Sequence, residues 1–284
     1  MLVSSDVGLI NPILTKIHPT AIIAKEAEVS AGVEIGPYSI IGKDARIGEN
    51  TYIGPHVIIE GRTEIGPNCK LIAACSIGLP PQDLSYRGEL TGVRIGENTI
   101  IREYVTIHRA AKEGYTTVGK SCYLMNYVHL AHNVQLGNNV MMANSATLGG
   151  YVIVEDFVFI GGLSPVHQHC RIGESAMVGG MTAVRLDLPP YFIADGSPAK
   201  MRGVNKIGLR RRGIKADVRE ELSKAYKIIY LSGLNTTNAL EKIEKELIQF
   251  EEIKKLVNFY RTSKRGVVGI SLEEDDSNAL FGKF

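Results

Sequence analysis

Tryptophan is absent from this sequence of 284 residues, and aromatic residues together make up only 7% of it. A chain with so few large side chains must fill its core with small and branched aliphatic residues. The sequence also lacks an uninterrupted apolar run of the roughly 18 residues that a membrane-spanning helix needs. Its N-terminus has no basic region followed by an apolar stretch, as a secretory signal would. We therefore expect a cytoplasmic protein without a membrane span.

An excess of charge of one sign is lacking as well. The formal net charge is +2, which argues against a general nucleic-acid binder, and the 44% of hydrophobic residues excludes a wholly disordered chain. Cysteine is scarce, with four residues, and no CxxC spacing suggests a zinc site or a disulfide framework. Glycine is the abundant residue, with 30 copies.

Aliphatic residues recur at every sixth position of the chain. The register runs from Ile17 to Ile77, resumes from Ile95 to Ile107, and restarts from Val118 to Val184. Glycine often follows the aliphatic residue, and a small or branched residue stands four places after it. All four cysteines fall in this second slot: Cys69, Cys75, Cys122 and Cys170. We predict that they are buried and act as small hydrophobic residues.

Neither a helical period of 3.6 nor a strand period of 2 produces strict sixes, so the repeat predicts a hexapeptide β-solenoid. It resembles the left-handed parallel β-helix family, in which three hexapeptides form one triangular coil of 18 residues. The handedness follows from this resemblance, because parallel strands normally cross over with the right hand. Glycine, asparagine and aspartate are expected at the corners, where a positive φ is needed. A β-sandwich would not keep one register for so long.

Interruptions of the repeat and a change of pattern after Val184 suggest the following organisation. We expect an N-terminal segment over residues 1–16, a β-helix over 17–195 with projecting loops at 79–92 and 109–117, a C-terminal helical domain over 196–262, and a flexible tail over 263–284. In the helical domain, Asp217 is the expected N-cap of one helix, a second begins near Thr236, and a third ends near Arg261.

The coil period predicts which residues stack on one another. His132 should lie below Gly150, and Gly150 below Gln168, with His167 beside it. The same rule stacks His108, Asn126 and Asn144. An imidazole next to an exposed backbone N–H is the pair of groups that acyl transfer requires, as a base and an oxyanion donor.

Positive charge is concentrated where the chain leaves the repeat. Residues Lys200 to Lys227 contain ten Lys or Arg and three Asp or Glu, a net charge of +7. Arg210, Arg211 and Arg212 are consecutive, and guanidinium groups suit phosphates and acidic partners. A solvated helix face is the alternative reading. The segment lacks interleaved aromatic residues, so we do not expect nucleic acid as a partner.

Seven motifs together resemble those of the UDP-N-acetylglucosamine 3-O-acyltransferase family, in the same order: QDLSY, IREYVTIHRA, HLAHN, VHQHC, VGGM, DLPPYFIADG and GVNKIGLRRRG. The resemblance runs from about Ile17 to about Arg261. It implies a homotrimer with active sites in the clefts between subunits. It also implies transfer of an (R)-3-hydroxyacyl chain from acyl carrier protein to the glucosamine 3-hydroxyl of UDP-N-acetylglucosamine, the first step of lipid A biosynthesis. No metal or resident cofactor is implied, because the acyl chain arrives on the phosphopantetheine of acyl carrier protein.

The resemblance also implies roles for single residues. His132 matches the general base that deprotonates the sugar hydroxyl, and Gly150 matches the backbone N–H that stabilises the thioester oxyanion. Its missing side chain would admit the thioester carbonyl. The cleft residues that hold the sugar and acyl groups are matched by His129, His167 and Gln168.

Further matches concern the ends of the two substrates. Gln82 and Asp83 match contacts to the nucleotide sugar, and Asn205 and Arg212 match contacts to the uridine diphosphate end. Gly180 matches a position near the end of the acyl groove. The arginine run, which includes Arg211, would also face the acidic surface of acyl carrier protein.

The sequence departs from the family pattern at three positions. Ser85 stands where lysine is common, Asn133 where aspartate is expected, and Tyr151 where histidine is usual. An asparagine oxygen can fix the imidazole tautomer but brings no charge to support an imidazolium.

A 3-amino or another UDP-sugar therefore stays open as the acceptor. Two other classes also stay open. One is a non-catalytic scaffold, and the other is a γ-type carbonic anhydrase with a metal bound by His108, His129 and His132.

Overall fold

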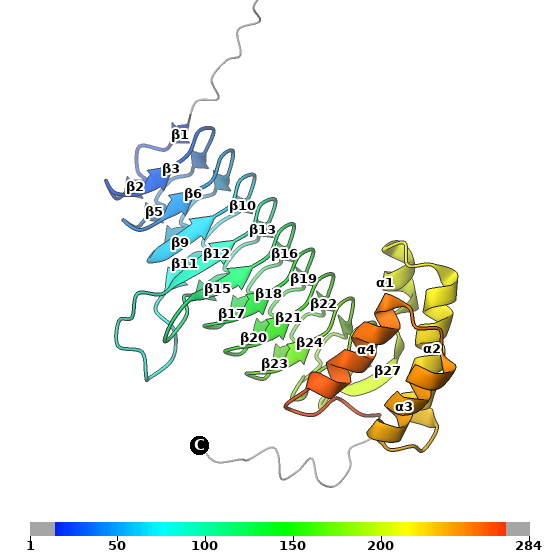
Figure 1. Cartoon of the computed structure of the whole chain (residues 1–284). Helices are drawn as coiled ribbons and strands as arrows, with labels where there is room; N and C mark the ends of the chain where they lie inside the picture. The colour runs from blue at the N-terminus through cyan, green and yellow to red at the C-terminus, as the bar shows by residue number, and fades with distance from the viewer. Residues whose placement is uncertain (1–14, 271–284) are drawn as a thin grey trace, which may run out of the picture.

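The computed structural model describes residues 15–270, which form a left-handed parallel β-helix with a helical domain at its C-terminal end (Figure 1). Within these residues the strands make three sheets, here called A, B and C, which are the faces of a triangular prism. Because consecutive strands up to β25 go to A, B and C in turn, each sheet collects every third strand, and the last two strands, β26 and β27, extend sheet A. The predicted fold class is therefore confirmed.

The strands are short and keep the order in which the coils are stacked. Sheet A contains β1 (Lys16–Ile17), β4 (Glu34–Ile35), β7 (Tyr52–Ile53), β10 (Lys70–Leu71), β13 (Ile100–Ile101), β16 (Tyr123–Leu124), β19 (Met141–Met142), β22 (Phe159–Ile160), β25 (Met177–Val178), β26 (Phe192–Asp195) and β27 (Lys200–Val204). Sheet B contains β2 (Ile22–Ile23), β5 (Ile40–Ile41), β8 (Ile58–Ile59), β11 (Ser76–Leu79), β14 (Thr106–His108), β17 (His129–Leu130), β20 (Thr147–Leu148) and β23 (Pro165–Val166). Sheet C contains β3 (Glu28–Val29), β6 (Arg46–Ile47), β9 (Arg62–Ile65), β12 (Gly92–Ile95), β15 (Tyr115–Val118), β18 (Gln135–Leu136), β21 (Ile153–Val154) and β24 (Arg171–Ile172).

The aliphatic residue of each hexapeptide points into the prism, as the repeat predicts. Ile53, Leu71 and Leu130 are completely buried, and the same holds for most of their equivalents. The four cysteines are free and buried, which confirms their assignment to the core. Burial raises the pKa of the Cys69 thiol to about 11, so it stays protonated at neutral pH.

The expectation for the corners is confirmed for asparagine and wrong for most of the repeat's glycines. Asparagines such as Asn50 have a positive φ, but so do residues of other types, such as Tyr127, and the glycines that follow the aliphatic residue mostly do not. The glycine that follows the aliphatic residue is needed for space instead, because neighbouring coils approach closely there. A Cβ on Gly54, for example, would overlap with the carbonyl oxygen of Ile72 in the next coil.

Two insertions lengthen the coils at one corner. Leu130 pairs with Leu148, 18 residues on, as a regular coil requires. Thr106 and His129, by contrast, pair across 23 residues, and Glu64 and Arg94 across 30. The extra residues project as loops 80–91 and 109–114, shorter than predicted because the flanking positions belong to β11, β12 and β15. Both loops follow a strand of sheet B and precede one of sheet C, so they project from the B–C corner.

The described residues contain four α-helices: α1 (Lys206–Arg211), α2 (Ala216–Leu231), α3 (Thr236–Glu246) and α4 (Glu251–Thr262). The expected cap of α2 was wrong. Lys215 is its N-cap, and the Asp217 carboxylate accepts a hydrogen bond from Val218 N–H inside the first turn. Asn205 caps α1, with its side-chain oxygen accepting from Gly208 N–H at 3.0 Å.

Residues 263–270, which the sequence pattern assigns to the tail, pack on the end of the prism. The Ser263 hydroxyl donates to the buried carboxylate of Asp187 at 2.8 Å, and Val268 N–H donates to the Asp187 carbonyl at 3.0 Å. Met201 N–H donates to Gly269. The rest of the expected tail and residues 1–14 lie outside the described residues. Among residues 15–270, no helix combines the length and the apolar character needed to cross a membrane.

Candidate active site

The B–C corner carries the residues that point to catalysis. After β17 the chain turns from sheet B to sheet C, and His132 lies in this turn. The loops 80–91 and 109–114 project from the same corner in the two preceding coils. The sequence therefore places an imidazole where the regular coil has been interrupted twice.

Asn133 fixes the orientation of the His132 ring. The Asn133 side-chain oxygen lies 3.1 Å from His132 Nδ1 and also accepts a hydrogen bond from Ala111 N–H at 2.9 Å. The amide nitrogen of Asn133 donates to the Glu113 carbonyl at 3.2 Å. Because the oxygen must therefore face the imidazole, His132 Nδ1 donates and Nε2 keeps its lone pair. This is the tautomer that a general base requires.

Asn133 thus does more than replace a carboxylate. Its two ends tie loop 109–114 to the His132 ring, and an aspartate could not donate to Glu113. Its φ of 59° also suits asparagine. One coil further, Tyr151 packs edge-on against His132, with ring centroids 5.2 Å apart, and stacks on His169 at 4.9 Å.

Gly150 lies directly over the His132 ring, so the predicted stacking of these two residues is confirmed. A Cβ on Gly150 would stand 2.7 Å from His132 Nε2, which means that the glycine makes room for the imidazole itself. No described residue accepts a hydrogen bond from Gly150 N–H. The same hexapeptide position holds Pro37 and Pro55, which have no N–H at all, so the strand ladder leaves this donor unused.

Loop 80–91 brings a carboxylate near Nε2 of His132, whereas Asn133 contacts Nδ1. Asp83 Oδ2 lies 3.9 Å from His132 Nε2. The hydrogen bond from Ser85 N–H to Asp83 Oδ1, 2.8 Å long, is the main reason that the pKa of Asp83 is lowered, and His132 adds to it. A negative charge therefore faces the nitrogen at which an imidazolium would form, although Asn133 brings none.

A second pair of imidazoles lies on sheet B beside this corner. His129 Nδ1 contacts the Thr106 hydroxyl at 2.7 Å, and burial lowers the pKa of His129 to about 4. Its ring is 4.9 Å from that of His108, whose pKa is also lowered by burial. Both rings are therefore neutral at pH 7.

The predicted column of His108, Asn126 and Asn144 is wrong at its first step and confirmed at its second, because Leu124 pairs with Met142, 18 residues on, and Asn126 and Asn144 follow them at equivalent positions. The insertion at 109–114 shifts the register by five residues, so His108 meets His129. Asn126 donates to Glu103 instead, at 2.7 Å. The spacing between these two residues is 23, as the lengthened coil requires.

Two predicted nucleotide contacts lie at a different corner of the prism. Asn205 is buried, caps α1, and donates to the carbonyl of Ser175 at 2.9 Å. Arg212 donates to Glu174 and to the Ser175 hydroxyl, and its guanidinium lies 3.9 Å from the centre of the Phe157 ring. Ser175 turns from sheet C to sheet A, so this C–A corner is not the corner of His132.

Comparisons with known proteins agree with this arrangement. The sequence model described as "Udp N-acetylglucosamine O-acyltransferase; Domain 2" matches residues 187–268, and "Bacterial transferase hexapeptide (six repeats)" matches 44–77 and 115–150. Over 256 residues the chain is 51% identical to "Acyl-[acyl-carrier-protein]--UDP-N-acetylglucosamine O-acyltransferase" of Thermodesulfovibrio yellowstonii, covering 89% of this chain and 99% of the relative. The protein of that name from Aquifex aeolicus is 52% identical over 254 residues, covering 89% and 97%.

Solved structures give the same result. The structure of LpxA from Acinetobacter baumannii superposes with a TM-score of 0.86 at 38% identity, covering 89% of this chain and 99% of that chain. The chain belongs to the UDP-N-acetylglucosamine O-acyltransferase family. Membership does not favour the carbonic anhydrase or scaffold alternatives. Among residues 15–270, no three His, Cys, Asp or Glu side chains of one chain come together to hold a metal.

The remaining residues matched to the acyltransferase family are spread over two corners. His167, Gln168 and Gln82 are exposed at or beside the B–C corner. Gly180 is exposed at the corner between sheets A and B. The position of a Cβ on Gly180 is open, with its closest neighbour, Gly162 O, at 3.6 Å. Packing within the chain therefore does not require glycine there.

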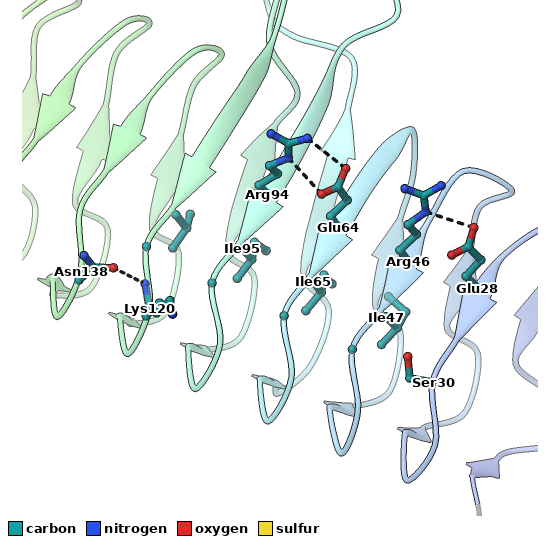
Figure 2. A pocket seen from close by; sticks show the side chains of 15 residues that line it. Glu28, Ser30, Arg46, Ile47, Glu64, Ile65, Arg94, Ile95, Lys120 and Asn138 are labelled. Carbon is teal, nitrogen blue, oxygen red and sulfur yellow. Dashed lines mark hydrogen bonds and ion pairs between the residues drawn. The ribbon is translucent and has the colours of Figure 1, made fainter.

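A groove elsewhere on this acyltransferase chain offers a contrast. It runs along the outer face of sheet C, where Arg46 pairs with Glu28 at 3.2 Å and Arg94 with Glu64 at 3.0 Å (Figure 2). Its lining residues include none of those matched to the family. The paired charges leave it without a free reactive group, so we do not place the site there.

Sequence reasoning missed three contacts of the site and one residue, Arg109. The carboxylate of Asp83 faces His132, Asn133 bonds to loop 109–114, and Arg109 bonds to loop 80–91. Each depends on where an irregular loop folds back. The hexapeptide spacing carries no signal for such contacts, although the interruptions themselves showed where to look.

Proposed function

We propose that this protein transfers an (R)-3-hydroxyacyl chain from acyl carrier protein to the glucosamine 3-hydroxyl of UDP-N-acetylglucosamine, in the first step of lipid A biosynthesis, and that it works in the cytoplasm. Family membership supports the reaction class. The observation that carries the assignment of the site is the oriented His132 imidazole directly below the unused N–H of Gly150.

In this mechanism His132 Nε2 removes the proton of the sugar hydroxyl as the oxygen attacks the thioester carbonyl. A sugar hydroxyl is a poor nucleophile at neutral pH, so a base at hydrogen-bond distance is required. Asn133 holds Nδ1–H and keeps Nε2 free. The Asp83 carboxylate, 3.9 Å from Nε2, favours the imidazolium that results. The imidazolium then returns its proton to the departing thiolate of the phosphopantetheine.

The negative charge that develops on the thioester oxygen needs a hydrogen-bond donor close to the His132 imidazole. Gly150 N–H has no acceptor within the described chain and lies in the layer next to the imidazole. A preorganised backbone donor of this kind stabilises an oxyanion without reorganising during the reaction. His129, neutral because its pKa is about 4, can accept or donate a hydrogen bond to the sugar, together with His167 and Gln168.

The placement of Asn205 and Arg212 supports a homotrimer. In one chain they lie at the C–A corner, whereas His132 lies at the B–C corner. Both sets can contact one UDP-sugar only if a second copy supplies one of them. A prism with flat faces suits closed three-fold packing. Exposed apolar side chains along the A–B corner would be covered in such an assembly: Tyr38, Tyr104, Tyr127, Leu163 and Met181.

The exposed Arg210 and Arg211 are proposed to meet the acidic surface of acyl carrier protein. Arg212 already has a carboxylate partner, Glu174, so only the part of its guanidinium that does not contact Glu174 is left for a substrate phosphate.

The proposal is tested by incubating the purified protein with UDP-N-acetylglucosamine and hydroxyacyl carrier protein. We expect an ester at the sugar 3-position, and a trimer in sedimentation. A protein that forms no such product with acyl donors of any length would overturn the function. An active monomer would overturn the shared site. A parallel incubation with a 3-amino analogue of the sugar nucleotide tests the alternative acceptor.

A further inference from the structure

Loop 80–91 has few attachments to the body of the prism. Its tip is exposed, and Leu84 is 98% exposed. Within residues 15–270, the only side chains outside the loop that hydrogen-bond to it are Arg109 and Arg62. Arg62 contacts the carbonyl of Leu90, near the base, at 3.4 Å. Among the described residues, Arg109 is the only one outside the loop whose side chain hydrogen-bonds to the loop near Gln82 and Asp83, where the only other charged contact is that of Asp83 with His132.

The contact of Arg109 is made with the side chain of Tyr86. Arg109 Nε donates to the Tyr86 hydroxyl at 3.0 Å, and the guanidinium lies 5.5 Å from the ring centre. The hydroxyl in turn donates to the Glu89 carbonyl at 3.1 Å. Both side chains are half-buried. The Tyr86 hydroxyl therefore bonds both to another residue of the loop and to Arg109, which directly follows strand β14 of the prism.

The Arg109 guanidinium fits against two glycines of the prism, Gly78 and Gly61. Arg109 Nη1 donates to the carbonyl of Gly78 at 3.4 Å. It also passes over Gly61, where a Cβ would stand only 2.6 Å from Nη1. A side chain at Gly61 would therefore displace Arg109. Gly61 also has a φ of 60°, which favours glycine, so one residue both makes the turn and leaves room for the guanidinium.

The contact between Arg109 and Tyr86, here called the latch, is connected to the His132 imidazole through a tight turn of loop 80–91. Tyr86 N–H donates to the Asp83 carbonyl at 3.0 Å, and Ser85 N–H donates to the Asp83 carboxylate. Fixing Tyr86 therefore fixes Asp83, which lies 3.9 Å from His132. We propose that Arg109 and Tyr86 are positioning residues, which hold loop 80–91 over the catalytic corner so that Gln82 and Asp83 meet the UDP-sugar in a preformed geometry.

This inference rests on the proposed function and assigns a task to residues that touch neither substrate. A loop that must be ordered on binding weakens affinity for the ligand that it contacts. Loss of the latch should therefore weaken binding of the acceptor sugar and spare the acyl donor. It should change kcat little, because the bound sugar orders the loop again through Gln82 and Asp83 and so returns Asp83 to His132 before the chemical step. A merely structural role would lower stability and affect both substrates alike.

The test uses Tyr86→Phe, which removes the hydroxyl and keeps the ring, and Arg109→Met, which removes the guanidinium. We expect KM for UDP-N-acetylglucosamine to rise about tenfold, the typical value of a hydrogen bond to a charged group. We expect kcat to change by less than about twofold and KM for the acyl donor to stay the same. The matched control is Tyr123→Phe, because Tyr123 accepts from Arg102 at 2.9 Å on sheet A, away from the loop.

A second readout does not require activity. Arg87 lies exposed in the loop and is a trypsin site. Its cleavage should be faster in both variants than in the wild type and in Tyr123→Phe. Unchanged KM and unchanged cleavage would overturn the latch, and so would an equal loss toward both substrates with a lower Tm. If the wild type does not transfer acyl groups, the proposed function fails, but the cleavage rates still decide whether the latch exists.

Discussion

The B–C and C–A corners of the prism start from the same hexapeptide and diverge. At the C–A corner, asparagines with positive φ recur in Asn50, Asn68, Asn98 and Asn139, and each backbone N–H bonds to the coil before it wherever that coil is described. At the B–C corner, two coils are opened by insertions, and the positive φ positions of the next coils hold Asn133, Tyr151 and His169. The C–A corner thus keeps a short turn in every described coil up to β25, with asparagine at half of its positive φ positions and Gly32, Ser121, Phe157 and Ser175 at the others. The B–C corner combines its three different side chains with two inserted loops.

The comparison shows why a solenoid can carry an active site at little cost in the stability of its core. The insertions disturb the strand pairing only locally, with a shift of register between Ile77 and Leu79, and Ile77 and Ile95 on either side of loop 80–91 stay buried in sheets B and C. Each coil contacts only its neighbours, so a change at one corner is not transmitted around the prism. Function can therefore accumulate at one corner while the others keep the fold.

The largest effect should come from His132→Ala. We expect the trimer to stay folded, because the ring lies outside the aliphatic core, and kcat to fall by roughly 10²–10⁴, the usual contribution of general base catalysis. The matched control is His56→Ala, an exposed histidine with φ 57° in an uninterrupted coil. Steady-state kinetics decide the matter. Full activity of His132→Ala would end its assignment as the base.

The next effect should come from Gly150→Ala. Its methyl group would stand 2.6 Å from the His132 ring and must push the imidazole aside. We expect kcat to fall about 10- to 100-fold, since small displacements of a reacting group are costly. Gly42→Ala, whose methyl meets the Glu60 side chain at 3.0 Å and a backbone oxygen at 3.1 Å, should keep its kcat. Similar kcat values for both variants would show that the space over His132 has no catalytic meaning.

A smaller effect is expected from the arginines near the C–A corner. Arg211→Ala should raise KM for acyl carrier protein several-fold at low salt, and the difference should shrink at high salt because exposed charges are screened. Arg212→Ala should also lower the Tm, since it leaves Glu174 with one cation fewer and uncovers Phe157. Kinetics at two ionic strengths, with thermal melts, separate the two roles. Salt-independent KM values for Arg211→Ala would make it a solvated side chain.

The smallest effect concerns acid stability. Because the pKa of His129 is about 4 in the folded chain and ordinarily 6.5, the unfolded chain binds a proton between these values that the folded chain does not. Stability from this residue is thus complete above pH 6.5 and lost as the pH falls toward 4. His129→Gln should lose less Tm than the wild type between pH 7 and pH 5. His56→Gln should follow the wild type. An unchanged pH dependence in His129→Gln would contradict the burial of that ring as the cause.

Much of the site could be predicted from the sequence because the repeat is strict where it is uninterrupted. Between Leu130 and Val166 the coils are regular, so counting 18 residues correctly placed Gly150 over His132. The same counting failed for His108, because loop 109–114 adds five residues whose path the period does not describe.

The sequence by itself determined the hexapeptide solenoid, the buried thiols and the two places where the repeat is broken, because these follow from spacing, while the three-sided coil followed from the resemblance to the left-handed β-helix family. Only the tertiary structure decided that Asp83 faces His132, that Asn133 holds a loop, and that Arg212 already has a carboxylate partner. It also showed that Gly150 makes room for an imidazole. The physical reason is that a period fixes where backbone positions lie, whereas side-chain partners depend on how irregular loops fold back across the coils.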